Sequence, residues 1–121
     1  MGVPSTFSWV LLLCTVPNVC NYTFRKPSGI IANYEGPETV CVWTIQISSG
    51  GKIVLKLPTI RLNCAKEKLE IMNGPVGSSF LGKPCNGVNF LYRSTSNVMT
   101  IRYSRKSGFF PSFFSMSYSK I

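Results

Sequence analysis

The sequence contains no histidine and no aspartate, and its acidic residues are only Glu35, Glu38, Glu67 and Glu70. A Ser-His-Asp triad, a Cys-His pair and a histidine-based zinc site therefore cannot be assembled. Glu67 and Glu70 are three positions apart, which places them on opposite faces of a strand rather than facing each other as glycosidase carboxylates do. We therefore expect a binding protein and not an enzyme.

Long apolar runs are also absent, except near the start of the chain. Residues 10–16 form a short apolar stretch before Pro17, too short for a transmembrane helix. We interpret 1–19 as a secretory signal peptide, with Thr15 fitting the small-residue rule at the cut better than Val19. The alternative is a buried first strand. A signal predicts a secreted, extracellular protein whose single domain spans 20–121.

The cysteine content supports secretion. Of five cysteines, Cys14 would leave with the signal peptide, and Cys20, Cys41, Cys64 and Cys85 would remain. An oxidising compartment favours two disulfides over buried free thiols. Four cysteines allow three pairings, and their spacing does not choose among them.

The remaining sequence is typical of an all-β protein. Helical periodicity is lacking, and short alternating runs are separated by Gly, Pro, Asn and Ser clusters. Pro58 is expected to end one of these strands. Each strand can bury one face, so we predict two packed sheets. The predicted strands are 40–47, 52–57, 69–72, 89–93, 97–104 and 113–118.

An apolar segment precedes the end of the chain, with Phe109, Phe110, Phe113 and Phe114 around Pro111. The last predicted strand places Phe114, Met116 and Tyr118 on one side, and alternation can bury one of Phe113 and Phe114 but not easily both. One of the two is therefore a candidate for contact with a partner or a membrane, the alternative being core packing.

The formal charge of +9 is the main indication of function from composition. A positive surface attracts polyanions such as glycosaminoglycans, sialylated or sulfated glycoproteins and anionic membranes. Ordinary solvated faces are the alternative. Nucleic acid is not expected, because secretion argues against it and no nucleic-acid motif is present. The candidate polyanion-binding residues are Lys52, Lys56, Arg61, Lys66, Lys68, Arg102, Arg105 and Lys106.

Three segments resemble CUB domains. The first runs from Cys20 through PSGII (27–31) to CVWTI (41–45); the second has Cys64, LEI (69–71), NG (73–74) and Cys85; the third has VMTI (98–101) and GF (108–109). Within that fold the chain is most similar to the spermadhesins, through EGP (35–37), CAKE (64–67), NGPVGS (73–78) and TIRY (100–103).

The resemblance implies a CUB-type sandwich of two antiparallel sheets, similar to a jelly roll. It implies disulfides Cys20–Cys41 and Cys64–Cys85. It also implies a seminal-fluid protein that coats sperm, binds glycans, heparin-like polyanions or egg-coat glycoproteins, and forms dimers with itself or with relatives. Peripheral attachment to the cell surface would follow, and no cofactor is implied.

Many CUB domains bind calcium through three acidic residues. Here Glu67 stands at the first position and Arg105 at the second, and no acid lies between Glu38 and Glu67. Calcium needs six to eight oxygen ligands with carboxylates among them. We therefore expect no metal site, and an ion pair between Glu67 and Arg105 in its place.

Two further expectations remain open. Asn21-Tyr22-Thr23 is an N-glycosylation sequon, although the neighbouring Cys20 could hinder its modification. A soluble signalling ligand and a cationic antimicrobial protein are the alternative functions, since each needs only a suitable surface.

Overall fold

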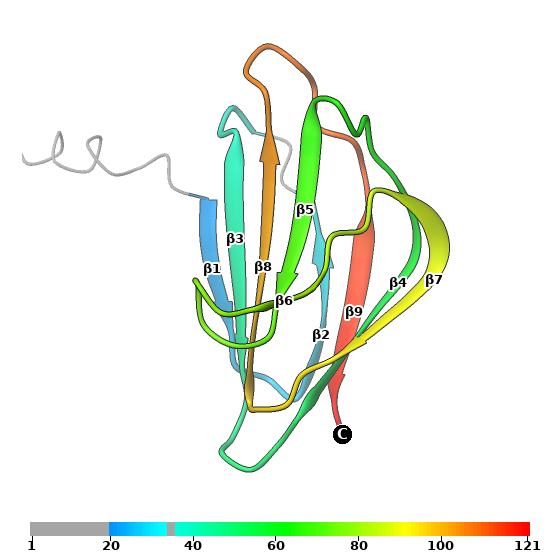
Figure 1. Cartoon of the computed structure of the whole chain (residues 1–121). Helices are drawn as coiled ribbons and strands as arrows, with labels where there is room; N and C mark the ends of the chain where they lie inside the picture. Colours follow the sequence, from blue (N-terminus) through cyan, green and yellow to red (C-terminus); the bar gives the residue numbers. More distant parts are fainter. Residues whose placement is uncertain (1–19, 34–35) are drawn as a thin grey trace, which may run out of the picture.

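The computed structural model describes residues 20–33 and 36–121 (Figure 1). The predicted signal segment 1–19, with Cys14, lies outside the described residues. No helix in the described part of the chain is long and apolar enough to cross a membrane. The strands are β1 (Cys20–Phe24), β2 (Ser28–Ala32), β3 (Val40–Gln46), β4 (Ile53–Arg61), β5 (Glu67–Met72), β6 (Phe80–Gly82), β7 (Asn86–Arg93), β8 (Val98–Arg105) and β9 (Ser115–Lys120).

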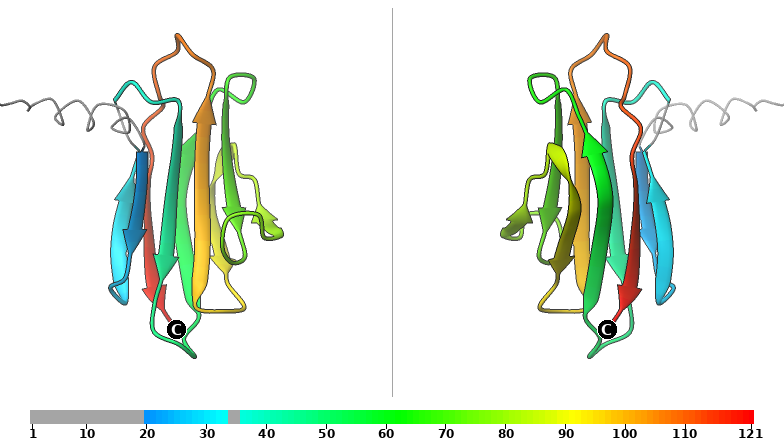
Figure 2. Two further views of the ribbon diagram at one scale, coloured as in Figure 1. Left: turned by 90° about the vertical axis from the view of Figure 1, so that its left-hand side faces the viewer. Right: turned by 90° about the vertical axis from the view of Figure 1, so that its right-hand side faces the viewer.

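The strands form two packed sheets, as predicted. One sheet has the order β1-β3-β8-β5-β6 and the other the order β2-β9-β4-β7. All strand pairs are antiparallel except one: β1 runs parallel to β3, with Cys20 opposite Cys41. The expectation of purely antiparallel sheets is wrong at this pair. The reason lies in the connection between the two strands. After β1 the chain crosses to the other sheet and runs back as β2, so that β3 enters the first sheet in the same direction as β1 (Figure 2).

The core lies between the two sheets and follows the alternation of the sequence. In β4, Ile53, Leu55 and Leu57 are fully buried, while Lys56 is exposed on the outer face. Phe114 is buried among aromatic rings, with its ring centroid 6.3 Å from Trp43 and 5.6 Å from Tyr103. Burial of such side chains supplies most of the stabilisation of a sandwich.

Pro58 does not end its strand, contrary to expectation. Strand β4 continues to Arg61, and it pairs with β7 from Val54 to Arg61. Its pairing with β9 stops at Lys56. Beyond Lys56, β4 is therefore an edge strand on one side, where a proline without an N–H can be accommodated.

One end of the sandwich, which we call the loop end, carries the residues that matter for function. It consists of the segment 36–39 before β3, the β4–β5 connection 62–66 and the β8–β9 connection 106–114. The last of these forms the outermost part of the molecule at this end (Figures 1 and 2).

Candidate functional site

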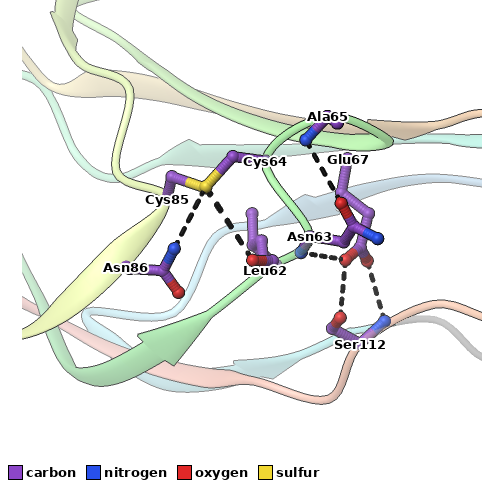
Figure 3. Close-up of a disulfide and its surroundings, with 8 residues drawn as sticks. All are labelled: Leu62, Asn63, Cys64, Ala65, Glu67, Cys85, Asn86 and Ser112. Atoms are coloured by element: carbon purple, nitrogen blue, oxygen red, sulfur yellow. Dashed lines mark hydrogen bonds between the residues drawn. A yellow bond between two sulfur atoms is a disulfide. The ribbon is translucent and has the colours of Figure 1, made fainter.

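The disulfide Cys64–Cys85 fixes the base of the loop end. It joins the β4–β5 connection to the residue before β7. The backbone N–H of Leu62 donates to the carbonyl of Cys85 at 2.9 Å, and the side chain of Asn86 donates to the sulfur of Cys64 at 3.1 Å (Figure 3). The second disulfide joins Cys20 to Cys41. These are the pairings that the family resemblance implies.

Glu67 lies at the centre of the loop end, and its carboxylate is buried. Its Oε1 accepts hydrogen bonds from the N–H of Asn63 at 2.8 Å and the hydroxyl of Ser112 at 2.6 Å (Figure 3). Its Oε2 accepts from the N–H of Ser112 at 2.8 Å and from the hydroxyl of Tyr103 at 2.5 Å. Four donors therefore satisfy a charge that would otherwise be costly to bury.

These donors change the acidity of the groups involved. Burial by itself raises the pKa of Glu67, but the hydrogen bonds from Ser112, Tyr103 and Asn63 outweigh it, so that the pKa is lowered. Burial raises the pKa of Tyr103, and the bonded Glu67 carboxylate raises it further. Glu67 is therefore an ionised structural acceptor at neutral pH.

Arg105 has a structural role different from the expected one. It lies opposite Glu67 in the register of β5 and β8, yet the two side chains form no ion pair. Its guanidinium donates instead to the carbonyl oxygens of Phe109 at 2.5 Å, Gly36 at 3.1 Å and Glu38 at 3.3 Å. The expected ion pair is wrong because loop carbonyls accept hydrogen bonds from both terminal nitrogens of the guanidinium, while Glu67 finds uncharged partners.

A shallow depression of about 270 Å³ on the loop end is rimmed by cations. Its lining includes Lys66, Lys68, Arg105 and Lys106. The N–H of Lys106 donates to the carbonyl of Lys66 at 2.9 Å, which holds the two lysine-bearing segments together. Arg105 and the ionised Glu67 carboxylate both line this depression and carry opposite charges, so that its net positive charge equals that of the three lysines.

The other predicted polyanion-binding residues are divided among different surfaces. Arg61 ends β4 and is exposed at the loop end. Lys56 lies on the outer face of the four-stranded sheet. Arg102 lies on the outer face of the five-stranded sheet and pairs with Glu70 at 2.8 Å. Lys52 lies at the end opposite the loop end, next to the C-terminal residue, whose N–H donates to its carbonyl.

That opposite end gathers cations that sequence reasoning did not select. These cations are Arg25, Lys26 and Lys120. The N–H of Lys120 donates to the carbonyl of Pro27, the residue after Lys26. Lys120 also lies opposite Ile53, the residue after Lys52, in the pairing of β9 with β4. These residues are far apart in sequence, so no local pattern indicates that they meet Lys52. Lys83 was also not selected; it reaches Glu70 at 3.9 Å.

The sequon lies on an accessible strand. Asn21 is exposed on β1, which is an edge strand of its sheet because it pairs only with β3. The neighbouring Tyr22 is about half exposed.

Residues 20–118 match the model of the CUB domain family, and the fold described above is that of a CUB domain. Among curated proteins, the chain is 44% identical to carbohydrate-binding protein AWN of Sus scrofa over 89 residues, which are 74% of this chain and 58% of that protein. It is 37% identical to the major seminal plasma glycoprotein PSP-I of Sus scrofa over 118 residues, covering 89% and 88%. It is 38% identical to spermadhesin Z13 of Bos taurus over 88 residues, covering 73% and 76%. The chain belongs to the spermadhesins.

A solved structure shares this fold. The CUB2 domain of MASP-1 bound to Ca²⁺ superposes with a TM-score of 0.66 at 18% identity, covering 81% of this chain and 96% of that one, which shows a shared fold. The residues at the loop end can be compared with what a calcium ion requires. Both Glu67 oxygens already accept two hydrogen bonds each, and the Arg105 guanidinium lines the same depression. Residues 20–33 and 36–121 contain no cluster of three or more potential metal ligands from His, Cys, Asp and Glu. The residues of the described part of the chain do not fit calcium, which needs several carboxylate oxygens.

Proposed function

We propose that this spermadhesin is a secreted glycan-binding protein that holds anionic glycans, such as heparin-like polyanions or sulfated and sialylated glycoproteins, at the loop end. The observation that carries the proposal is the depression rimmed by Lys66, Lys68 and Lys106, in which Glu67 is buried and bound to four donors. Clustered ammonium groups attract sulfate and carboxylate groups in a salt-dependent manner.

Relatives support the carbohydrate part of this proposal. One is named a carbohydrate-binding protein, and another is named a seminal plasma glycoprotein. The surface of sperm or egg is accordingly the proposed place of action, with glycoproteins there as partners. Homo- or heterodimers with related spermadhesins and peripheral attachment to cells are part of the same proposal.

Binding is proposed to be independent of calcium. The connections 36–39, 62–66 and 106–114 are joined by the hydrogen bonds of Glu67 and Arg105, all of which come from the protein itself. These contacts support the proposal that the lysine-bearing segments are ordered without a metal ion. An N-glycan on Asn21 would extend from the β1 edge and is proposed as a modification that leaves the lysines open.

Two triple variants with the same change in charge test the site. Lys66→Gln/Lys68→Gln/Lys106→Gln removes the rim, and Lys52→Gln/Lys56→Gln/Lys120→Gln removes three exposed cations elsewhere. On a heparin column the parent chain should elute well above physiological salt, the rim variant near it, and the control variant close to the parent. Elution of both variants at one salt concentration would refute the site. Elution of the parent chain at physiological salt would refute the function.

A further inference from the structure

The β8–β9 connection presents phenylalanines to solvent. The exposed fractions are 40% for Phe109, 95% for Phe110 and 71% for Phe113. Phe110 is the most exposed of the large apolar side chains in the described part of the protein. Large aromatic side chains are usually buried, and several of them exposed on one short segment indicate a surface that contacts something apolar.

The loop is held in place while its phenylalanines point outward. Arg105 binds the carbonyl of Phe109, Glu67 binds the N–H and hydroxyl of Ser112, and the side chain of Asn33 donates to the carbonyl of Ser112 at 2.8 Å. Phe114, which directly follows Phe113, is buried in the core and anchors the end of the connection. Because the segment is fixed on both sides of Phe110, little conformational freedom is lost when the exposed rings become buried in a partner.

The β8–β9 connection projects beyond the neighbouring connections at the loop end of the sandwich (Figures 1 and 2). A hollow of about 440 Å³ beside it is lined by Gly36, Pro37, Arg105 and residues 108–111. A projecting tip can enter a flat, deformable interface, whereas a protein partner would need a groove that matches it.

The charges around the tip complement a negative surface. The ammonium group of Lys66 lies 4.2 Å from the centre of the Phe109 ring, and Lys106 is exposed at the start of the loop. Lys68, which is exposed, adds a third cation next to the half-buried Lys66 and the exposed Lys106. Of the acids near the tip that the structure describes, Glu38 is half-buried and the carboxylate of Glu67 is buried. Apolar side chains surrounded by lysines are suited to the interface of an anionic bilayer, where the rings enter the headgroup region and the lysines contact the lipid phosphates.

We propose that the β8–β9 connection docks on anionic phospholipid membranes by inserting Phe110 and Phe113, with Lys66 and Lys106 at the headgroups. This adds a lipid contact to the proposed glycan binding. The lysines serve both activities, but the phenylalanines serve only the membrane contact. The two proposals can therefore fail separately.

Vesicle binding with matched variants tests the proposal. The test pair is Phe110→Ser/Phe113→Ser. The control pair is Ile30→Ser/Val88→Ser, which alters two side chains that are 73% and 62% exposed on other strands. In sedimentation with phosphatidylcholine vesicles containing phosphatidylserine, the test pair should weaken binding about tenfold or more, and the control pair should leave it unchanged. Vesicles of phosphatidylcholine alone should bind the parent chain more weakly.

A spectroscopic measurement locates the contact. With Phe110→Trp, the added fluorescence should shift to the blue on binding and be quenched by brominated lipid, whereas the added fluorescence of Ile30→Trp should not change. Thermal unfolding of all variants should match the parent chain, because the altered side chains are exposed. The test pair should still elute from heparin like the parent.

Three results would overturn the proposal. The first is equal binding by the test and control pairs, and the second is an unshifted emission from Phe110→Trp in the presence of bound vesicles. The third is a parent chain that ignores anionic vesicles but self-associates through the phenylalanines in light scattering, which would assign the tip to a protein contact. Loss of heparin binding in the test pair would instead place the phenylalanines in the glycan site.

Discussion

Glu67 accepts hydrogen bonds from both the N–H and the hydroxyl of Ser112, at 2.8 and 2.6 Å. This contact joins the start of β5 to the β8–β9 connection, two segments 45 positions apart in the chain. It holds the β8–β9 connection against the β4–β5 connection at the loop end.

The first prediction concerns Glu67 and pH. Glu67→Gln should lower the free energy of unfolding at pH 7 by about 2 kcal/mol, because an amide cannot accept all four hydrogen bonds. The folded-state pKa of Glu67 is lowered. Its stabilisation is therefore complete above the ordinary glutamate pKa of about 4.3 and is lost as the pH falls through the lower folded value. Urea denaturation at a series of pH values measures both effects.

Glu67→Gln should also lose less stability on acidification than the parent chain does. Glu38→Gln is a suitable control, since the contact of Glu38 with Arg105 uses its backbone carbonyl and not its carboxylate. Parallel stability curves for the parent chain and Glu67→Gln below pH 5 would show that Glu67 is not the linked group.

The second prediction separates structural from binding cations. Arg105→Met should lower the free energy of unfolding by about 2 kcal/mol, because the carbonyls of Gly36, Glu38 and Phe109 lose a charged donor. Lys106→Met should leave stability within about 0.5 kcal/mol of the parent value, because its side chain is exposed. Chemical denaturation gives the first comparison.

Heparin chromatography below the unfolding temperature gives the second comparison. Lys106→Met should elute at lower salt than Arg105→Met, although each removes one charge. The reverse order would make Arg105 a ligand contact and contradict the role assigned to it.

The third prediction distinguishes the two disulfides. Each closes a sequence separation of 21, so removing either pair by substitution with alanine should cost about 3 kcal/mol. Only Cys64→Ala/Cys85→Ala should also weaken heparin binding by the folded protein, because Cys64 lines the same depression as the lysines. Cys20→Ala/Cys41→Ala removes a disulfide between β1 and β3 that does not line the depression, and it serves as the control. Equal heparin affinity in the two double variants would mean that heparin binding at the loop end does not depend on the disulfide Cys64–Cys85.

The fourth prediction uses two adjacent phenylalanines. Phe114 is 2% exposed and Phe113 is 71% exposed. Phe114→Ala should lower the free energy of unfolding by about 3–5 kcal/mol, while Phe113→Ala should change it by less than about 0.5 kcal/mol. Similar losses in equilibrium denaturation would show that both rings belong to the core.

Much of the fold follows from local pattern. Alternation correctly predicted that Phe114, Met116 and Tyr118 share one face, which the structure turns to the core, and that Phe113 and Phe114 are not both buried. The end of β4 was wrongly predicted because the effect of Pro58 depends on where β9 stops. The parallel pairing of β1 with β3 also depends on sheet topology, which no local pattern specifies.

The candidate site was only partly predictable. Lys66 and Lys68 are neighbours in sequence, and their place beside Lys106 follows from the pairing of β5 with β8. Lys52 was grouped with these cations in the sequence analysis, but it lies at the other end of the sandwich. The grouping failed because the sequence positions of cations do not show which strands pair. The role of Arg105 could not be predicted, because its partners are backbone carbonyls of two separate loops.

The central claim is that an anionic glycan binds at the lysine rim without calcium. Its most direct test is titration of the isotopically labelled protein with a heparin oligosaccharide in buffer containing EDTA, followed by amide chemical shifts in NMR spectra. The account predicts saturable shifts concentrated in residues 61–68 and 104–110. Shifts concentrated in residues 25–27, 48–52 and 120, or shifts that occur only after calcium is added, would contradict it.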